Sequence, residues 1–184
     1  MRFFARFHAP VMLFTLVLGL CLAVDTARAQ SHPEQFVGDY SGSADVIMSD
    51  GTLLKRDMSV SIWTTKEGFS VKWISVSYLG TGVREKSYEI AFLPTDRPGV
   101  FAAGMTRNVF GHAVQLDPMK GEPYVWARII DDTLTVFSLF VDAQGGYELQ
   151  QYDRTLVEGG LQLDFQRFDN GVPQKAVSTF LKRG

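Results

Sequence analysis

The chain has 184 residues, with 18 lysines and arginines against 20 aspartates and glutamates, and a formal net charge of −2. This balance lacks the basic surplus that nucleic-acid binding requires, so we expect no nucleic-acid partner. Hydrophobic residues make up 46% of the chain, and a chain of this length can bury a core in a single domain.

Residues 1–29 have the pattern of a secretory signal peptide. A basic start is followed by an uncharged apolar stretch over 11–24, and Ala27-Arg28-Ala29 supplies a small-x-small cleavage pattern. The apolar stretch is shorter than the roughly 20 residues of a membrane-spanning helix. We therefore expect cleavage after Ala29, a periplasmic or secreted location, and no membrane span.

The only cysteine, Cys21, lies within this apolar stretch. Lipid attachment at Cys21 is the alternative to secretion, but the preceding residue, Leu20, is not small. After cleavage, residues 30–184 keep 15 basic and 19 acidic residues, a net charge of −4, and no cysteine. The mature domain would therefore be held together by its core, without disulfides or thiol chemistry.

A long alternating stretch from Gln35 to Ser49 opens the mature chain. Its even positions are all apolar, aromatic or glycine, and its odd positions are mostly polar. A period of two predicts a strand with one buried face, and this length is typical of a barrel wall. On the apolar face, Gly38 and Gly42 predict a bend or a close approach of another backbone.

Short hairpin turns separate the runs that follow, and no stretch predicts an amphipathic helix. The further predicted strands are 53–64, 69–78, 83–92, 100–105, 124–130, 133–141, 147–156, 161–168 and 172–181. We therefore expect an all-β fold, a single antiparallel up-and-down β-barrel of about 8–10 strands over 30–184. The first strand would close the barrel against the last, which removes exposed edges.

Two irregularities interrupt this regular pattern. The apolar positions change phase between Trp73 and Ile74, which predicts a β-bulge or a strand buried on both faces. The segment from Thr106 to Pro123 contains scattered glycines and prolines and is the longest irregular piece. Loops of this length in a compact domain are often binding loops or lids, so this one is a candidate functional loop.

The opening Phe36-Val37-Gly38-Asp39-Tyr40 resembles the start of the calycin barrels, which include lipocalins and fatty-acid-binding proteins. In those families a G-x-W motif begins the first strand, and Tyr40 stands here at the tryptophan position. The resemblance implies a lipocalin-like barrel with an arginine of a late strand across that aromatic ring, either Arg167 or Arg183. Lipocalins have eight strands and usually a disulfide and a flanking helix, whereas fatty-acid-binding proteins have ten strands and two helices after the first strand. This sequence shows the complete set of features of neither family.

No catalytic or metal-binding constellation is found in the mature sequence. His32 and His112 have no second ligand at a metal-binding spacing, and neither a nucleophile elbow nor a phosphate-binding glycine loop occurs. Asp131-Asp132 falls at a two-residue turn, where acidic residues serve as turn formers. We expect no enzyme activity, no metal and no cofactor.

Basic residues on apolar registers are the strongest indication of a binding site. Arg56 and Arg128 share such registers with apolar neighbours, and Tyr40, Tyr88 and Trp126 are the aromatic residues nearest in pattern. A cation inside a barrel needs a partner, which an acidic ligand head group would supply while the aromatic residues line its tail. The alternative is that each cation lies near a strand end with its head in water.

The same reasoning gives weaker candidates for ligand binding. Arg84 and Lys86 share a register with Tyr88, and Gln150 and Tyr152 share one with Arg154. In this hypothesis the loop from Thr106 to Pro123 covers the mouth of the barrel.

Two functions therefore follow from the sequence. The first is an exported lipocalin-like protein that binds a small apolar or amphipathic ligand. The alternative is a structural or protein-interaction module of the cell envelope, with an envelope protein as partner and no internal pocket. In that case the barrel would be filled by its own large side chains, Phe92, Trp126, Phe137 and Phe165.

Overall fold

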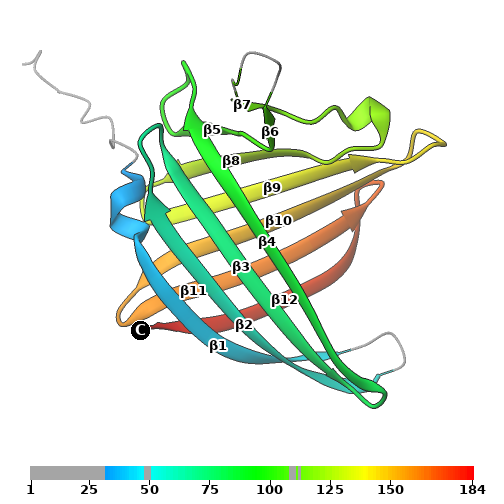
Figure 1. Ribbon diagram of the computed structural model, residues 1–184. Helices are drawn as coiled ribbons and strands as arrows, with labels where there is room; N and C mark the ends of the chain where they lie inside the picture. The colour runs from blue at the N-terminus through cyan, green and yellow to red at the C-terminus, as the bar shows by residue number, and fades with distance from the viewer. Residues whose placement is uncertain (1–31, 48–50, 108–110, 112) are drawn as a thin grey trace, which may run out of the picture.

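The structure is a computed structural model that describes residues 32–47, 51–107, 111 and 113–184. The predicted signal peptide and His112 lie outside the described residues. The described chain forms a single closed antiparallel up-and-down barrel of ten strands (Figure 1), which confirms the predicted fold class. No helix in this part of the chain is long and apolar enough to cross a membrane.

The barrel strands follow one another around the wall in chain order, and the last pairs with the first. They are β1 (Gly38–Ile47), β2 (Leu53–Thr64), β3 (Phe69–Leu79), β4 (Gly82–Pro94), β5 (Val100–Ala103), β8 (Tyr124–Ile130), β9 (Thr133–Val141), β10 (Tyr147–Val157), β11 (Gly160–Asp169) and β12 (Val172–Arg183). Between β5 and β8, a two-stranded sheet of β6 (Thr106–Arg107) and β7 (Ala113–Val114) precedes the 3₁₀ turn η2 (Pro118–Lys120). Another 3₁₀ turn, η1 (Pro33–Phe36), precedes β1.

The barrel closes where β1 meets β12, as the sequence predicts. Tyr40 lies opposite Arg183 in this pairing, and the Thr179 hydroxyl donates a 2.8 Å hydrogen bond to the carbonyl of Ser43. A Cβ atom on Gly42 would lie 2.3 Å from the carbonyl oxygen of Phe180. The backbone of β12 therefore approaches β1 so closely at this point that only glycine fits.

One half of the barrel interior, at the end that η1 covers, is filled by apolar side chains. Phe36 of η1 is fully buried there, and the Tyr40 hydroxyl donates a 2.9 Å hydrogen bond to its carbonyl. The Arg183 guanidinium lies over the Tyr40 ring at 5.7 Å and donates a hydrogen bond to the Val37 carbonyl. Of the two arginines that the calycin resemblance offers for this position, Arg183 occupies it.

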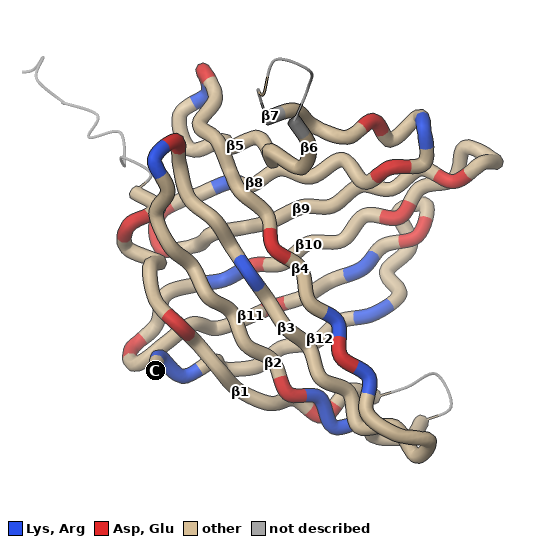
Figure 2. Tube along the Cα trace, viewed as in Figure 1, with Lys and Arg blue, Asp and Glu red and all other residues tan. Residues whose placement is uncertain are grey.

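The wall is incomplete beside β4. This strand pairs with β3 from Gly82 to Phe92, but with β5 only from Phe92 to Pro94, extended by a bond from the Gly104 amide to the Ala91 carbonyl. In the described part of the chain, residues 82–90 have no strand on their other side. Figure 2 shows basic and acidic residues alternating along this half of β4. Within the described part of the chain, residues 82–90 therefore form a free strand edge in an otherwise closed barrel.

Of the two structures predicted for the phase change after Trp73, the β-bulge is wrong, and Trp73 and Ile74 are both half-buried, as in a strand covered on both faces. Pairing of β3 with β2 and with β4 continues through Trp73 and Ile74 without a register shift, so no bulge lies there. The short lead before β1 forms η1, which the sequence did not indicate.

Candidate ligand-binding cavity

A cavity of about 300 Å³ occupies the half of the barrel away from η1. Its lining comes from β2, β3, β4, β10, β11 and β12. The volume corresponds to roughly ten water molecules at about 30 Å³ each and lies at the lower end of the range for small-molecule pockets. The barrel is thus filled in one half and hollow in the other.

A change of polarity along the inward registers produces this division. On β2 the inward residues change from Ile62 and Val60 to Met58 and then Arg56, and on β3 they change from Trp73 to Ser75 and Ser77. Charged side chains do not close-pack around one another in an apolar interior, because each must keep water or a polar partner. The same registers therefore build a core near η1 and a cavity beyond it.

Aromatic rings form the floor of the cavity. Trp73 of β3 stacks on Tyr88 of β4 at 5.4 Å, and its ring lies 5.8 Å from that of Tyr152. Tyr152 of β10 in turn contacts Phe165 of β11 at 4.7 Å. Because β3 and β10 lie on different walls, these rings meet across the interior and separate the cavity from the apolar core.

Arg154 is buried in this floor without an acidic partner. Its side chain is 1% exposed, and its guanidinium lies 5.5 Å from the Trp73 ring and 5.6 Å from the Tyr152 ring. Its Nη1 donates a 3.4 Å hydrogen bond to the Tyr152 carbonyl, and Nε has no partner among the described residues. Burial lowers the pKa of this guanidinium to about 10, which leaves it charged at neutral pH.

Five further cations line the cavity toward its open end. They are Arg56, Arg84, Lys86, Arg167 and Lys175. Burial lowers the pKa of Lys175, and the charges of Arg56, Arg167 and Lys86 lower it further. The like charges of four strands therefore converge on one region, which we call the cation rim.

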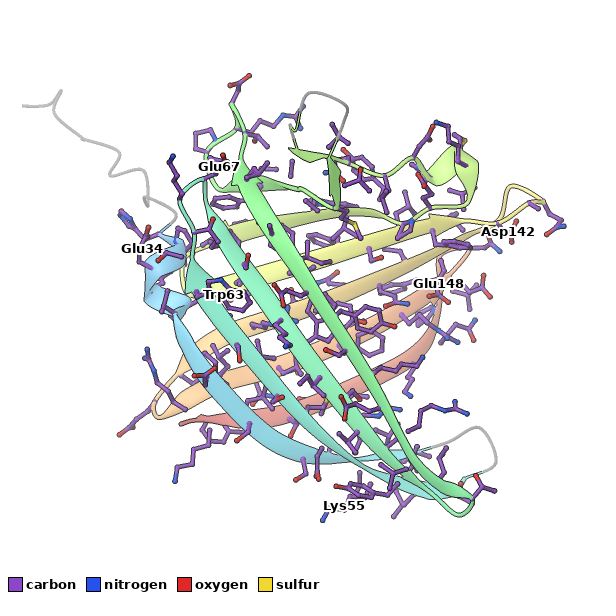
Figure 3. All side chains as sticks on the ribbon, in the orientation of Figure 1. Glu34, Lys55, Trp63, Glu67, Asp142 and Glu148 are labelled. Carbon is purple, nitrogen blue, oxygen red and sulfur yellow. The ribbon has the colours of Figure 1, made fainter. Side chains whose placement is uncertain are left out.

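One carboxylate lies close to this rim. Glu148 of β10 is 3.6 Å from Arg167 and accepts a 2.5 Å hydrogen bond from the Gln150 amide. The Tyr152 hydroxyl donates to the Gln150 oxygen at 2.7 Å, and burial raises the pKa of Tyr152 to about 12. Figure 3 shows Glu148 at the opposite end of the barrel from Glu34 of η1. None of the described cavity-lining residues is itself acidic.

The structure brings together only two of the five residues that the sequence singled out. Arg56 and Tyr88 line the cavity, and the Arg56 Nε donates a 3.0 Å hydrogen bond to Ser77. Tyr40 lies in the filled half, 2% exposed. Trp126 and Arg128 lie on the outer face of β8, where both contact the Phe137 ring.

The weaker candidates are better placed. Arg84, Lys86, Gln150, Tyr152 and Arg154 all line the cavity. Sequence reasoning missed Trp73 and Lys175 as lining residues. It expected Phe165 inside the barrel only as a filling side chain, and it considered Arg167 only as a partner of Tyr40. No described residue of the segment from Thr106 to Pro123 lines the cavity.

The fold and this site define a ten-stranded up-and-down β-barrel with a basic, aromatic-floored internal cavity. Comparisons with protein-family models, with curated proteins and with solved structures found no match to the chain. The described residues contain no group of three or more histidine, cysteine or acidic side chains that could hold a metal ion.

Proposed function

We propose that the protein is an exported, lipocalin-like binding protein whose ligand is a small amphipathic anion held in the cavity. The observation that carries the proposal is Arg154, a fully buried guanidinium without an acidic partner, which lies within the aromatic floor of the cavity. An unpaired buried charge costs several kcal/mol. An anion bound at Arg154 would offset this cost.

The remaining lining supports the same ligand class. The rings of Trp73, Tyr88 and Phe165 offer apolar contact, and the cation rim attracts negative charge to the opening. Export rests on the sequence pattern of residues 1–29, and the likeness to lipocalins rests on the barrel and on Arg183 over Tyr40.

Binding of octanoate, compared with neutral octan-1-ol of the same chain length, tests the proposal. Purified protein with residues 30–184 is titrated with each compound by calorimetry, and its thermal midpoint is measured with and without them. Octanoate is expected to bind and to raise the midpoint, and octan-1-ol to bind at least tenfold more weakly, because only octanoate carries a charge for Arg154.

Two arginine variants locate the binding. In Arg154→Met the affinity for octanoate should fall by about 30-fold or more, since losing one partner of a buried charge pair costs about 2–5 kcal/mol. The matched control is Arg128→Met on the outer face of β8, which should bind octanoate like wild type. Absence of octanoate binding in wild type, or equal binding by Arg154→Met, would overturn the proposal.

A further inference from the structure

The cavity separates its cations into two positions. Arg154 lies opposite Leu163 in the pairing of β10 with β11, and four residues nearer the opening Gln150 lies opposite Arg167. Arg167 is in turn opposite Lys175 of β12. Four residues along a strand span about 13 Å, so Arg154 and the Arg167–Lys175 pair are attached at two well-separated levels of the barrel.

The side chains between these two positions are largely apolar or aromatic. Tyr152, Phe165 and Val177 occupy inward positions between the level of Arg154 and the cation rim. Met58 of β2 lines the cavity as well. A ligand that extends from floor to rim therefore passes an apolar middle zone.

The site also carries more positive charge than one acidic group neutralises. Six cations line the cavity, and the nearby Glu148 is engaged by Arg167 and Gln150. Lys175 is crowded by Arg56, Arg167 and Lys86, and a second anion placed among them would relieve that repulsion. A ligand with its only acidic group at Arg154 would leave the cation rim uncompensated.

Resting on the anion binding proposed above, we propose that the ligand carries two acidic groups joined by an apolar segment. One group contacts Arg154 at the floor, the apolar segment lies along Tyr152 and Phe165, and the second group contacts the cation rim at Lys175.

Titration calorimetry with octanoate and octanedioate, at one ionic strength, separates this proposal from simple anion binding. Wild type is expected to bind octanedioate at least tenfold more tightly than octanoate, since the second carboxylate gains the rim contacts. Butanedioate, whose carboxylates are too close together to reach both positions, should bind no more tightly than octanoate.

A rim variant then tests where the second group lies. Lys175→Met should remove most of the advantage of octanedioate, while its octanoate affinity stays within about twofold of wild type. Equal affinity of wild type for octanoate and octanedioate would overturn the two-acid ligand and leave anion binding intact. An octanedioate advantage that survives in Lys175→Met would overturn the assignment to the rim. Absence of binding by both compounds would refute the proposed function together with this inference.

Discussion

Replacing Arg154 by methionine should make the protein more stable while it removes the proposed anion binding. The side chain is 1% exposed and its Nε has no hydrogen-bond partner among the described residues. Methionine is unbranched, apolar and flexible, and it fills irregular spaces well. The substitution therefore removes a buried charge and leaves a long side chain in the aromatic floor.

The size of the effect follows from the buried charge. Burial lowers the pKa of the Arg154 guanidinium to about 10, and each pKa unit corresponds to about 1.4 kcal/mol, so the charged form costs roughly 3 kcal/mol in the folded state. Methionine gives up the contacts with the Trp73 and Tyr152 rings, which contribute about 1–2 kcal/mol. The net gain in the free energy of unfolding is about 1–2 kcal/mol, or about 2–8 °C in thermal midpoint for a chain of this size.

Urea unfolding of the ligand-free proteins at neutral pH, followed by tryptophan fluorescence and circular dichroism, measures the gain. The control is Arg128→Met, which changes an exposed arginine and should stay within about 0.5 kcal/mol of wild type. If Arg154→Met proved less stable than wild type by 1 kcal/mol or more, Arg154 would be a structural residue and the binding argument would fail.

Three further outcomes are expected. The stability advantage of Arg154→Met should be constant below about pH 9 and shrink as the pH rises through about 10. In that range the folded wild type loses its destabilising Arg154 proton before the unfolded chain does. A difference in urea unfolding between the two proteins that stays flat up to pH 11 would contradict this. Gly42→Ala should lose about 1–3 kcal/mol or more, because its Cβ would overlap the Phe180 carbonyl, whereas Gly80→Ala, with open space around it, should change thermal stability little. Phe36→Ala should lose about 3–5 kcal/mol in urea unfolding, since Phe36 is fully buried at the covered end of the barrel; a loss below 1 kcal/mol would show that η1 contributes little to the core.

The fold could be predicted from the sequence because the patterns that indicate it are local. Alternation with a period of two and glycine-containing turns predict strands and hairpins one at a time. Closure of β1 against β12 then follows from the need to remove free edges, and the pairing of Tyr40 with Arg183 confirms it.

The site was harder to predict from the sequence because β8 has apolar residues on both faces. Val125 and Ala127 point into the core, while Trp126 and Arg128 pack on Phe137 outside. Because the aromatic stack makes the outer face of β8 as apolar as the inner face, alternation alone does not show which face points into the barrel.

One signal in the sequence did mark the cavity. After Trp73 the inward register continues with Ser75 and Ser77, which line the cavity, so the phase change marks where the interior changes from core to cavity. Recognising this requires the inter-strand register, which places Ser77 beside both Arg56 and Arg84. Long-range register is not contained in any single strand, and this is why Trp73 and Lys175 were missed as lining residues.

The unpaired length of β4 has a consequence for how molecules of this protein meet each other. A free strand edge is a template on which a second chain can add a strand and begin to aggregate, and inward-pointing charges on the edge strand are one of the devices that prevent it. Arg84 and Lys86 lie on that edge strand with their side chains in the cavity lining. A second molecule pairing along residues 82–90 would have to cover these two cations, so the charges that we propose attract an anion would also keep this free strand edge from joining another barrel.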